Sequence, residues 1–278
     1  MAKILYINPD ETGIWDTYFK EVLDRAARTD TEVFVTHLPV GDELMSQVGI
    51  ARVGRTYPPY IPLSQGELFR VLMQAEADGF DAAIIGCSAD PGLDMAKRTV
   101  NIPVTAPLEA GLYIAAMLRQ RVAVLIPAGF DDAHILYEDL AHAYGMERRI
   151  AWTGYVDVEY PPDEELQRLM DKDAAEARRV ILSCHRTSLD NEVARLSKIA
   201  IKEHGAGAIY CGCTFWTGML DPLAEELGVP VIDPGIAPLR VAEILADTMA
   251  RPSTRVAGTW QDGADAEEVV AVEVDKVP

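Results

Sequence analysis

The chain has 278 residues, of which 49% are apolar, and this composition is sufficient to bury the cores of two compact domains. Its 44 acidic and 25 basic residues give a formal charge of −19, which argues against nucleic acid or an anionic membrane as a partner, because both bind clustered Lys and Arg. No apolar run approaches the roughly 20 residues that span a bilayer, and the chain starts without a signal-peptide pattern. We therefore expect a cytoplasmic protein whose partner is a small molecule.

Predicted strands and helices alternate along the chain. In the first half we predict a strand over 4–8, a helix over 15–28, a strand over 32–37, a helix over 65–79 and a strand over 82–86. The second half repeats this order, with a strand over 122–126, a helix over 133–144, a strand over 150–156, helices over 164–180 and 191–203, and a strand over 208–212. Such alternation is typical of parallel sheets with helices on both faces and indicates an α/β protein.

Two segments at equivalent places in the halves read as copies of each other. Residues 82–88 read Ala-Ala-Ile-Ile-Gly-Cys-Ser, and residues 208–214 read Ala-Ile-Tyr-Cys-Gly-Cys-Thr. After a helix-length interval, each is followed by a short strand, Ile-Pro-Val at 102–104 and Val-Pro-Val at 229–231. Because self-similarity at this scale indicates duplicated units, we predict two similar doubly wound parallel-sheet domains related by pseudo-twofold symmetry. The active site is then expected in the cleft between the domains.

The helices predicted at 108–119 and 236–249 begin at corresponding places, just where each half closes. We expect each helix to cross into the other half, so that the chain connects the two domains twice. The first domain then comprises 1–108 and 235–278, the latter with a C-terminal helix and an acidic tail, and the second comprises 109–234. Two connections of this kind favour a hinged cleft.

Cys87 and Cys213 each follow an apolar strand, at the point where a helix is expected to begin. Four cysteines in a chain of this length do not make a disulfide scaffold, so we interpret them as thiols. Ligands of open α/β sheets bind beyond the carboxyl ends of the strands, and a helix start stabilises a thiolate. Across a cleft, a thiolate could remove a proton from one face of a carbon next to a carbonyl, and a thiol could return one to the other face. The pair therefore predicts a cofactor-independent racemase or isomerase.

Three polar residues are predicted to lie near the two cysteines. Ser88 and Thr214 directly follow them, and their N–H groups and hydroxyls could hold a carboxylate or carbonyl oxygen of the substrate, or could cap the helices that begin there. Asn8 ends the first strand and would project into the same cleft, where it could bind a polar substrate group or form a turn before Pro9. Both interpretations of each residue stay open.

A zinc site is the alternative role for the cysteines. Cys184-His185 and Cys211-Gly-Cys213 together offer four ligands of the zinc type. Structural zinc sites space paired cysteines by two to four residues, and neither pair has this spacing. We therefore predict that the protein binds no metal and that Cys184 and Cys211 are structural.

Three motifs carry a resemblance to a known family. They are Gly86-Cys-Ser-Ala-Asp-Pro-Gly-Leu93, Gly212-Cys-Thr214 and the opening Ile4-Leu-Tyr-Ile-Asn-Pro9. Together with the Ile-Pro-Val and Val-Pro-Val strands, these motifs resemble the aspartate/glutamate/hydantoin racemase superfamily, and in particular its hydantoin racemase branch, over about residues 3–249. The resemblance implies two αβ domains with the site in the cleft between them, no cofactor, and frequent homo-oligomerisation.

The resemblance also assigns roles to individual residues. Cys87 and Cys213 match the two catalytic cysteines of the family. Asn8, Ser88 and Thr214 match positions that bind polar groups of the substrate.

Two departures from the family pattern concern the substrate pocket. The opening continues Asn8-Pro-Asp-Glu-Thr12 in place of Asn-Pro-Asn-Thr, which alters the acceptors near the substrate. The second motif, Cys213-Thr-Phe-Trp-Thr-Gly-Met219, is longer than the Gly-Cys-Ala-Gly-Met of hydantoin racemases. Phe215 and Trp216 could reshape the pocket or pack in the adjoining helix.

The residues and the resemblance together predict a cofactor-independent two-cysteine racemase that inverts a stereocentre next to a carbonyl. The expected substrates are 5-substituted hydantoins. Alternative activities within the superfamily are amino-acid racemisation, maleate-type cis–trans isomerisation and decarboxylation, although superfamily decarboxylases manage with one cysteine and this chain has both. A hinged protein that binds a small molecule without transforming it is a further alternative, but neither an export signal nor an attached DNA-binding unit is visible in the sequence.

Overall fold

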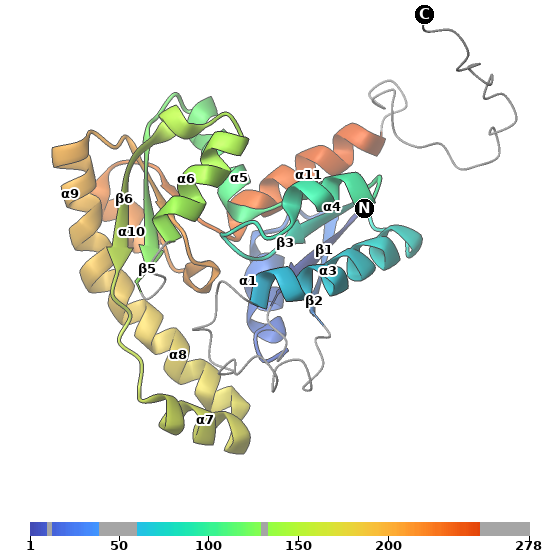
Figure 1. The fold of residues 1–278 in the computed structure, drawn as a ribbon, viewed down its shortest axis with the longest axis horizontal. Coiled ribbons are helices and arrows are strands. Elements are labelled where there is room, and N and C mark those ends of the chain that lie inside the picture. The colour runs from blue at the N-terminus through green and yellow to red at the C-terminus, as the bar shows by residue number, and fades with distance from the viewer. Residues whose placement is uncertain (10–12, 39–59, 129–132, 251–278) are drawn as a thin grey trace, which may run out of the picture.

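The computed structural model describes residues 1–9, 13–38, 60–128 and 133–250. Within these ranges the chain forms two four-stranded parallel sheets, which lie side by side with helices packed around them (Figure 1). Among the described helices, none is long and apolar enough to cross a bilayer. The acidic tail and the departure at Asp10-Glu-Thr12 lie outside the described residues.

The first sheet has the strand order β2-β1-β3-β4. Its strands are β1 (Ala2–Asn8), β2 (Thr31–His37), β3 (Ala82–Ile85) and β4 (Val104–Thr105), and its helices include α1 (Asp16–Ala26), α3 (Tyr60–Ala77) and α4 (Leu93–Thr99). Because successive side chains of a strand point to opposite faces, β1 directs Leu5 and Ile7 towards α3 and α4, and directs Ile4 and Tyr6 towards α1. The sheet is therefore buried on both faces, as its apolar strands predicted.

The second sheet repeats this plan with the order β6-β5-β7-β8. Its strands are β5 (Val122–Pro127), β6 (Ile150–Val156), β7 (Ala208–Cys211) and β8 (Val231–Ile232). One face packs against α5 (Pro107–Met117) and α6 (Ala133–Ala143), and the other against α9 (Ala194–His204) and α10 (Asp221–Leu227). When the strands are counted within each half, both sheets have the order second, first, third, fourth. The prediction of two similar parallel-sheet units is therefore confirmed.

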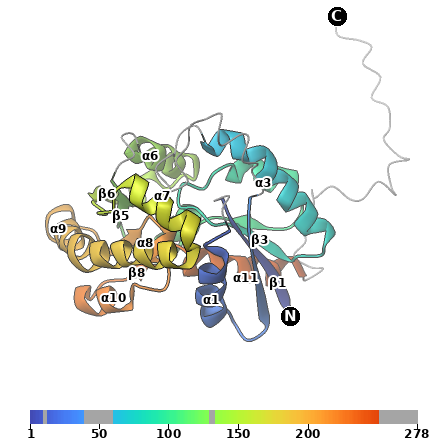
Figure 2. The same ribbon diagram turned by 90° about the horizontal axis from the view of Figure 1, so that it is seen from below.

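A long helical segment of the second half covers the first half. It comprises α7 (Asp163–Lys172) and α8 (Ala174–Ser188), which leads through a π-helical turn at Leu189–Val193 into α9. The single helix that we predicted over 164–180 is wrong, because Asp173 ends α7 and caps α8 by accepting the N–H of Glu176 at 3.0 Å. Figure 2 shows α8 running towards α1, where Arg178 donates to the carbonyl of Ile14 at 2.7 Å.

The chain crosses between the sheets at two helices. Leu108 and Leu112 of α5 pack with the second sheet, although α5 follows β4 of the first. Leu239 and Ala242 of α11 (Ile236–Ala250) pack with the first sheet, although α11 follows β8 of the second. The two helices contact each other at the junction of the halves (Figure 1). The division into 1–108 plus 235–278 and 109–234 stays a prediction.

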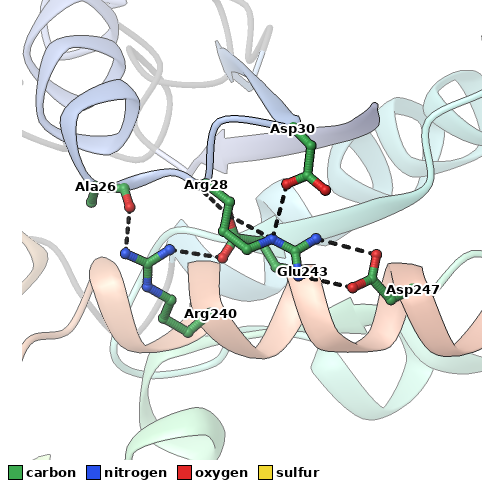
Figure 3. A network of polar contacts seen from close by, with 6 residues as sticks. All are labelled: Ala26, Arg28, Asp30, Arg240, Glu243 and Asp247. Atoms are coloured by element: carbon green, nitrogen blue, oxygen red, sulfur yellow. Dashed lines mark hydrogen bonds and ion pairs between the residues drawn. The ribbon is translucent and has the colours of Figure 1, made fainter.

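A polar network fastens α11 to the turn between α1 and β2 (Figure 3). The backbone N–H of Arg28 donates to Glu243 at 2.8 Å, and its guanidinium donates to Asp247 at 2.8 Å. Arg240 donates to the same Glu243 at 2.9 Å and to the carbonyl of Ala26. Because Glu243 is only 1% exposed, the two arginines supply the charge that its buried carboxylate needs.

Candidate active site

The two predicted catalytic cysteines occupy equivalent places in the structure. Cys87 lies two residues beyond the end of β3, and Cys213 lies two residues beyond the end of β7. Both cysteines are half-buried thiols that take part in no disulfide among the described residues. Each cysteine therefore stands at the carboxyl edge of its sheet, where ligands of parallel sheets bind.

The glycine before each cysteine is held by a tyrosine hydroxyl. Tyr6 donates to the carbonyl of Gly86 at 3.4 Å, and Tyr137 donates to the carbonyl of Gly212 at 3.1 Å. A Cβ atom on Gly86 would lie 2.4 Å from the Tyr6 ring, so only glycine permits this close approach. The two cysteine loops thus begin in the same way.

The two sulfurs lie within electrostatic reach of each other. Burial, together with a negative charge on Cys87, raises the pKa of Cys213 to about 12, although the N–H of Phe215 lowers it. Burial also raises the pKa of Tyr137, and charges on both Cys87 and Cys213 add to that effect. The two cysteines are therefore near enough for the charge of one to affect the ionisation of the other, and burial favours the neutral thiol of Cys213.

The residues after the cysteines meet tyrosines of the opposite half. Ser88 of the first half lies beside Tyr210 of β7, and Thr214 of the second half interacts with the hydroxyl of Tyr6 in β1. Within the described residues, the buried hydroxyls of Ser88 and Tyr210 make no hydrogen bond of normal geometry. The two hydroxyls lie close enough to influence each other, and each keeps further hydrogen-bonding capacity.

Asn8 closes β1 and is 5% exposed. Its neighbours in the sheet are β2 on one side, where His37 is its register partner, and β3 on the other. Since β3 leads directly into Cys87, Asn8 and Cys87 stand at the same edge of the first sheet.

Our expectation of helix starts at the cysteines is wrong. After Cys87 the chain turns at Gly92, whose φ of 68° is left-handed, and α4 begins only at Leu93. After Cys213 a single 3-10 turn spans Thr214–Trp216. Neither Ser88 nor Thr214 caps a helix, so a macrodipole does not stabilise either thiolate.

The two aromatic residues of the longer second loop have different surroundings. Trp216 is fully buried and donates its indole N–H to the carbonyl of His185 at 3.2 Å. Phe215 reaches across to the first half, where its ring lies 4.4 Å from that of Trp15 and 6.3 Å from that of Phe19. The longer loop therefore adds contacts between the halves.

Three of the four residues considered for zinc, Cys184, His185 and Cys211, lie in α8 or in the protein interior. Cys211 is fully buried, and His185 is 1% exposed, 2.8 Å from the hydroxyl of Tyr160. Burial lowers the pKa of His185 to about 3, so this imidazole is neutral. In the described parts of the chain, no three His, Cys, Asp or Glu side chains gather as metal ligands.

A groove of about 700 Å³ lies elsewhere, along the outer strand β6. Its walls include Glu138 of α6, Glu147 and the β6 residues Trp152 and Tyr155. None of the predicted site residues lines this groove, and no cysteine is among its lining residues. We therefore place the candidate site at the cysteines.

Three buried tyrosines belong to the site although the sequence analysis missed them. They are Tyr6, Tyr137 and Tyr210, and burial raises the pKa of each well above its ordinary value. All three therefore stay protonated, and Tyr6 and Tyr137 donate hydrogen bonds to the two glycine carbonyls. The available signal was a tyrosine within an otherwise apolar strand, as in Ile4-Leu-Tyr-Ile7, because a buried phenol usually has a polar partner.

Comparisons with known proteins identify the family of the chain. The family model described as Asp/Glu/Hydantoin racemase matches residues 17–242. A hydantoin racemase of Pseudomonas sp. (strain NS671) is 28% identical over 250 residues, which are 88% of this chain and 86% of that protein.

Solved structures share the fold. The allantoin racemase from Klebsiella pneumoniae superposes with a TM-score of 0.67 at 20% identity, covering 89% of this chain and 88% of that one. Unliganded arylmalonate decarboxylase superposes with a TM-score of 0.52 at 19% identity, covering 88% and 93%. Because the family model spans most of the described chain, we conclude that this protein belongs to the Asp/Glu/hydantoin racemase family and is an isomerase of the racemase class.

Proposed function

We propose that the protein inverts a stereocentre next to a carbonyl without a cofactor, using Cys87 and Cys213 as the acid and base. The observation that carries this proposal is the electrostatic coupling of two half-buried thiols on equivalent loops of the two halves. The proposed substrates are 5-substituted hydantoins, in line with the names of the curated relatives.

The reaction follows from the protonation states of the pair. With substrate between the sulfurs, the thiolate of one cysteine takes the proton from C5, and the electron pair of the C–H bond moves onto the carbonyl oxygen as an enolate. The thiol of the other cysteine then gives its proton to the opposite face of C5. One thiolate and one thiol remain, with their roles exchanged, so the opposite enantiomer is the substrate of the resulting state.

Only one cysteine is ionised at a time. A charge on Cys87 raises the pKa of Cys213, so ionisation of both sulfurs is disfavoured. The singly ionised pair is the state that a two-face proton transfer needs.

The polar groups around the sulfurs bind the substrate. We propose that Asn8, Ser88 and Thr214 hold its carbonyl oxygens and ring N–H groups. The buried hydroxyl of Ser88 supports this role, because within the described residues it makes no hydrogen bond of normal geometry. A donor at the enolate oxygen stabilises the charge that develops there.

Substitution of each cysteine tests the proposal. Cys87→Ser and Cys213→Ser should each lower the rate of racemisation of an enantiopure 5-alkylhydantoin by about 100-fold or more, measured by polarimetry. Cys184→Ser is the matched control and should keep the rate, because Cys184 is a partly buried thiol of α8. A wild-type rate in either of the first two variants would contradict the proposal.

Assays with other substrates, on the same variants, separate the alternative activities. An amino-acid racemase would leave hydantoins unchanged and racemise amino acids with the same cysteine dependence. A cis–trans isomerase would form a thioether on one cysteine, which mass spectrometry of the trapped protein would detect. Release of carbon dioxide from a malonate would indicate a decarboxylase.

The resemblance leads us to propose further that the protein is a cytoplasmic homo-oligomer. Light scattering of the purified protein tests the oligomeric state.

A further inference from the structure

Two aspartates link the cysteine loops to the helices that cross between the halves. Asp90 lies three residues after Cys87 and is 2% exposed, and Asp233 directly follows β8. The proposed reaction uses neither carboxylate. Each one nevertheless joins the loop of one cysteine to the first residues of α5 or α11.

Asp90 fixes the Cys87 loop to α5. Its backbone N–H donates to the carbonyl of Cys87 at 3.0 Å, which closes the turn. Its carboxylate accepts the N–H groups of Leu108 at 2.9 Å and Glu109 at 2.7 Å, and the hydroxyl of Tyr144 at 2.9 Å. The φ of Asp90 is 46°, which is unfavourable for a residue with a Cβ and persists only because these bonds hold it.

Asp233 makes the corresponding link in the second half. Its carboxylate accepts the N–H groups of Gly235 at 2.8 Å and Ile236 at 2.9 Å, where α11 begins. It also accepts the N–H of Gly218 at 2.7 Å, in the loop after Cys213. The carbonyl of Cys213 is held within that loop by the N–H of Trp216 at 3.0 Å.

A tyrosine of the opposite half completes each link. Tyr144 follows α6 of the second half and reaches Asp90 in the first. Tyr18 of α1 in the first half donates to the carbonyl of Thr217 at 2.7 Å, in the loop after Cys213. Each cysteine loop is therefore tied both to a crossing helix and to the other half.

We propose that Asp90 and Asp233 are positioning residues, which hold Cys87 and Cys213 at the separation and orientation that proton transfer on two faces of one carbon requires. The catalytic meaning of this role rests on the proposed function. The links themselves do not depend on it. A displacement of about 1 Å at a reacting group can lower a rate about 100-fold, so loops that carry the acid and base need such anchors.

Site-resolved alkylation of the cysteines tests the proposal without any substrate. Asp90→Asn and Asp233→Asn would be treated with iodoacetamide, and the rate at each cysteine followed by peptide mass spectrometry. We expect Asp90→Asn to change the rate at Cys87 about threefold to tenfold relative to Cys213, the size expected for one lost hydrogen bond. Asp233→Asn should change the rate at Cys213 relative to Cys87, and Cys184 serves as the internal reference.

Asp173→Asn is the matched control. Asp173 also caps a helix with its carboxylate, at the start of α8, but touches neither cysteine loop. It should leave the ratio of the two alkylation rates unchanged. The proposal would be overturned if the ratio of the alkylation rates at Cys87 and Cys213 stayed unchanged in folded Asp90→Asn and Asp233→Asn, including the case in which both rates change equally.

Milder variants cover the case in which an aspartate variant does not fold. Tyr144→Phe removes one bond to Asp90 and should alter Cys87 alone, and Tyr18→Phe should alter Cys213 alone. In the racemisation assay, Asp90→Asn should lower kcat about tenfold with little change in KM, and Asp90→Ala should lower it more because it leaves no acceptor. If Cys87→Ser racemises hydantoins normally, the proposed function fails, while the alkylation pattern still decides whether the links exist.

Discussion

The hydroxyl of Tyr137 donates a hydrogen bond of 3.1 Å to the carbonyl oxygen of Gly212, the residue directly before Cys213. The same phenol is within electrostatic reach of both catalytic candidates, because charges on Cys87 and Cys213 raise its pKa in addition to the larger effect of burial. One side chain of α6 thus anchors one cysteine loop and lies within electrostatic reach of both sulfurs. This relationship makes Tyr137 part of the site.

Removal of that hydroxyl should affect both stability and rate. Tyr137→Phe loses the bond to Gly212 and leaves a buried carbonyl without its donor, so unfolding should become easier by about 1 kcal/mol. The racemisation rate should fall several-fold because the Cys213 loop loses an anchor. Urea unfolding and polarimetry measure the two effects. Tyr113→Phe, at a 41% exposed side chain of α5, is the control and should change neither.

The stability of the protein should depend on pH through Asp90. Burial, together with the charge of Glu109, raises the pKa of Asp90 to about 7, although bonds from Leu108, Glu109 and Tyr144 lower it. In the unfolded chain the pKa is near 3.8. Between these values the folded state keeps a proton that the unfolded state has lost, so rising pH favours unfolding.

The expected slope is up to about 1.4 kcal/mol of unfolding free energy per pH unit between roughly pH 4 and 7. Asp90→Asn cannot titrate, so the difference in stability between this variant and the wild type should shift across that window and level off above about pH 7. Urea unfolding at several pH values gives the comparison. A constant difference from pH 4 to 8 would show that the pKa of Asp90 is ordinary.

Two helical glycines should respond in opposite directions to substitution by alanine. A Cβ on Gly111 of α5 would lie 2.6 Å from the buried ring of Tyr210, whereas a Cβ on Gly66 of α3 meets nothing within 4 Å. Gly111→Ala should therefore destabilise the protein by about 1–3 kcal/mol. Gly66→Ala should stabilise it by about 0.5–1 kcal/mol, because alanine restricts the unfolded chain more than glycine. Equal effects of the two in denaturant unfolding would refute the close packing of α5 on β7.

The polar network on α11 offers a second matched pair of substitutions, one at a buried and one at an exposed carboxylate. Glu243 is 1% exposed and bonds both Arg28 and Arg240, whereas Asp247 is about half exposed and bonds the guanidinium of Arg28. Glu243→Ala should lower the free energy of unfolding by about 2–3 kcal/mol, since it leaves buried donors without acceptors. Asp247→Ala should cost less than about 1 kcal/mol, as solvent-exposed ion pairs do. Thermal unfolding distinguishes the two.

The sequence was sufficient to predict the two parallel sheets and the equivalent places of Cys87 and Cys213. Those predictions depend on apolar runs and on a local repeat, both of which can be recognised within a few neighbouring residues. The helix starts expected at the cysteines were wrong because Gly92 adopts a left-handed φ and delays α4. Turn geometry of this kind is decided by the packing of the loop, which the pattern of residue types does not contain.

Contacts over long sequence separations could not be predicted in the same way. Asp90 bonds Leu108 and Tyr144, and Tyr18 bonds Thr217 across the two halves. These pairs meet only after both sheets and the crossing helices have formed. A single sequence shows each of them as an ordinary polar residue of a loop or helix.

The origin of the proton that arrives at the stereocentre tests the central claim most directly. An enantiopure 5-alkylhydantoin would be incubated with the wild-type protein in deuterium oxide, and the two enantiomers separated at early conversion for mass spectrometry. With one sulfur on each face, the newly formed enantiomer should carry deuterium at C5 while the remaining starting enantiomer keeps its hydrogen. Deuterium in both enantiomers from the first turnovers would show that a single base serves both faces, and would contradict the pairing of Cys87 with Cys213.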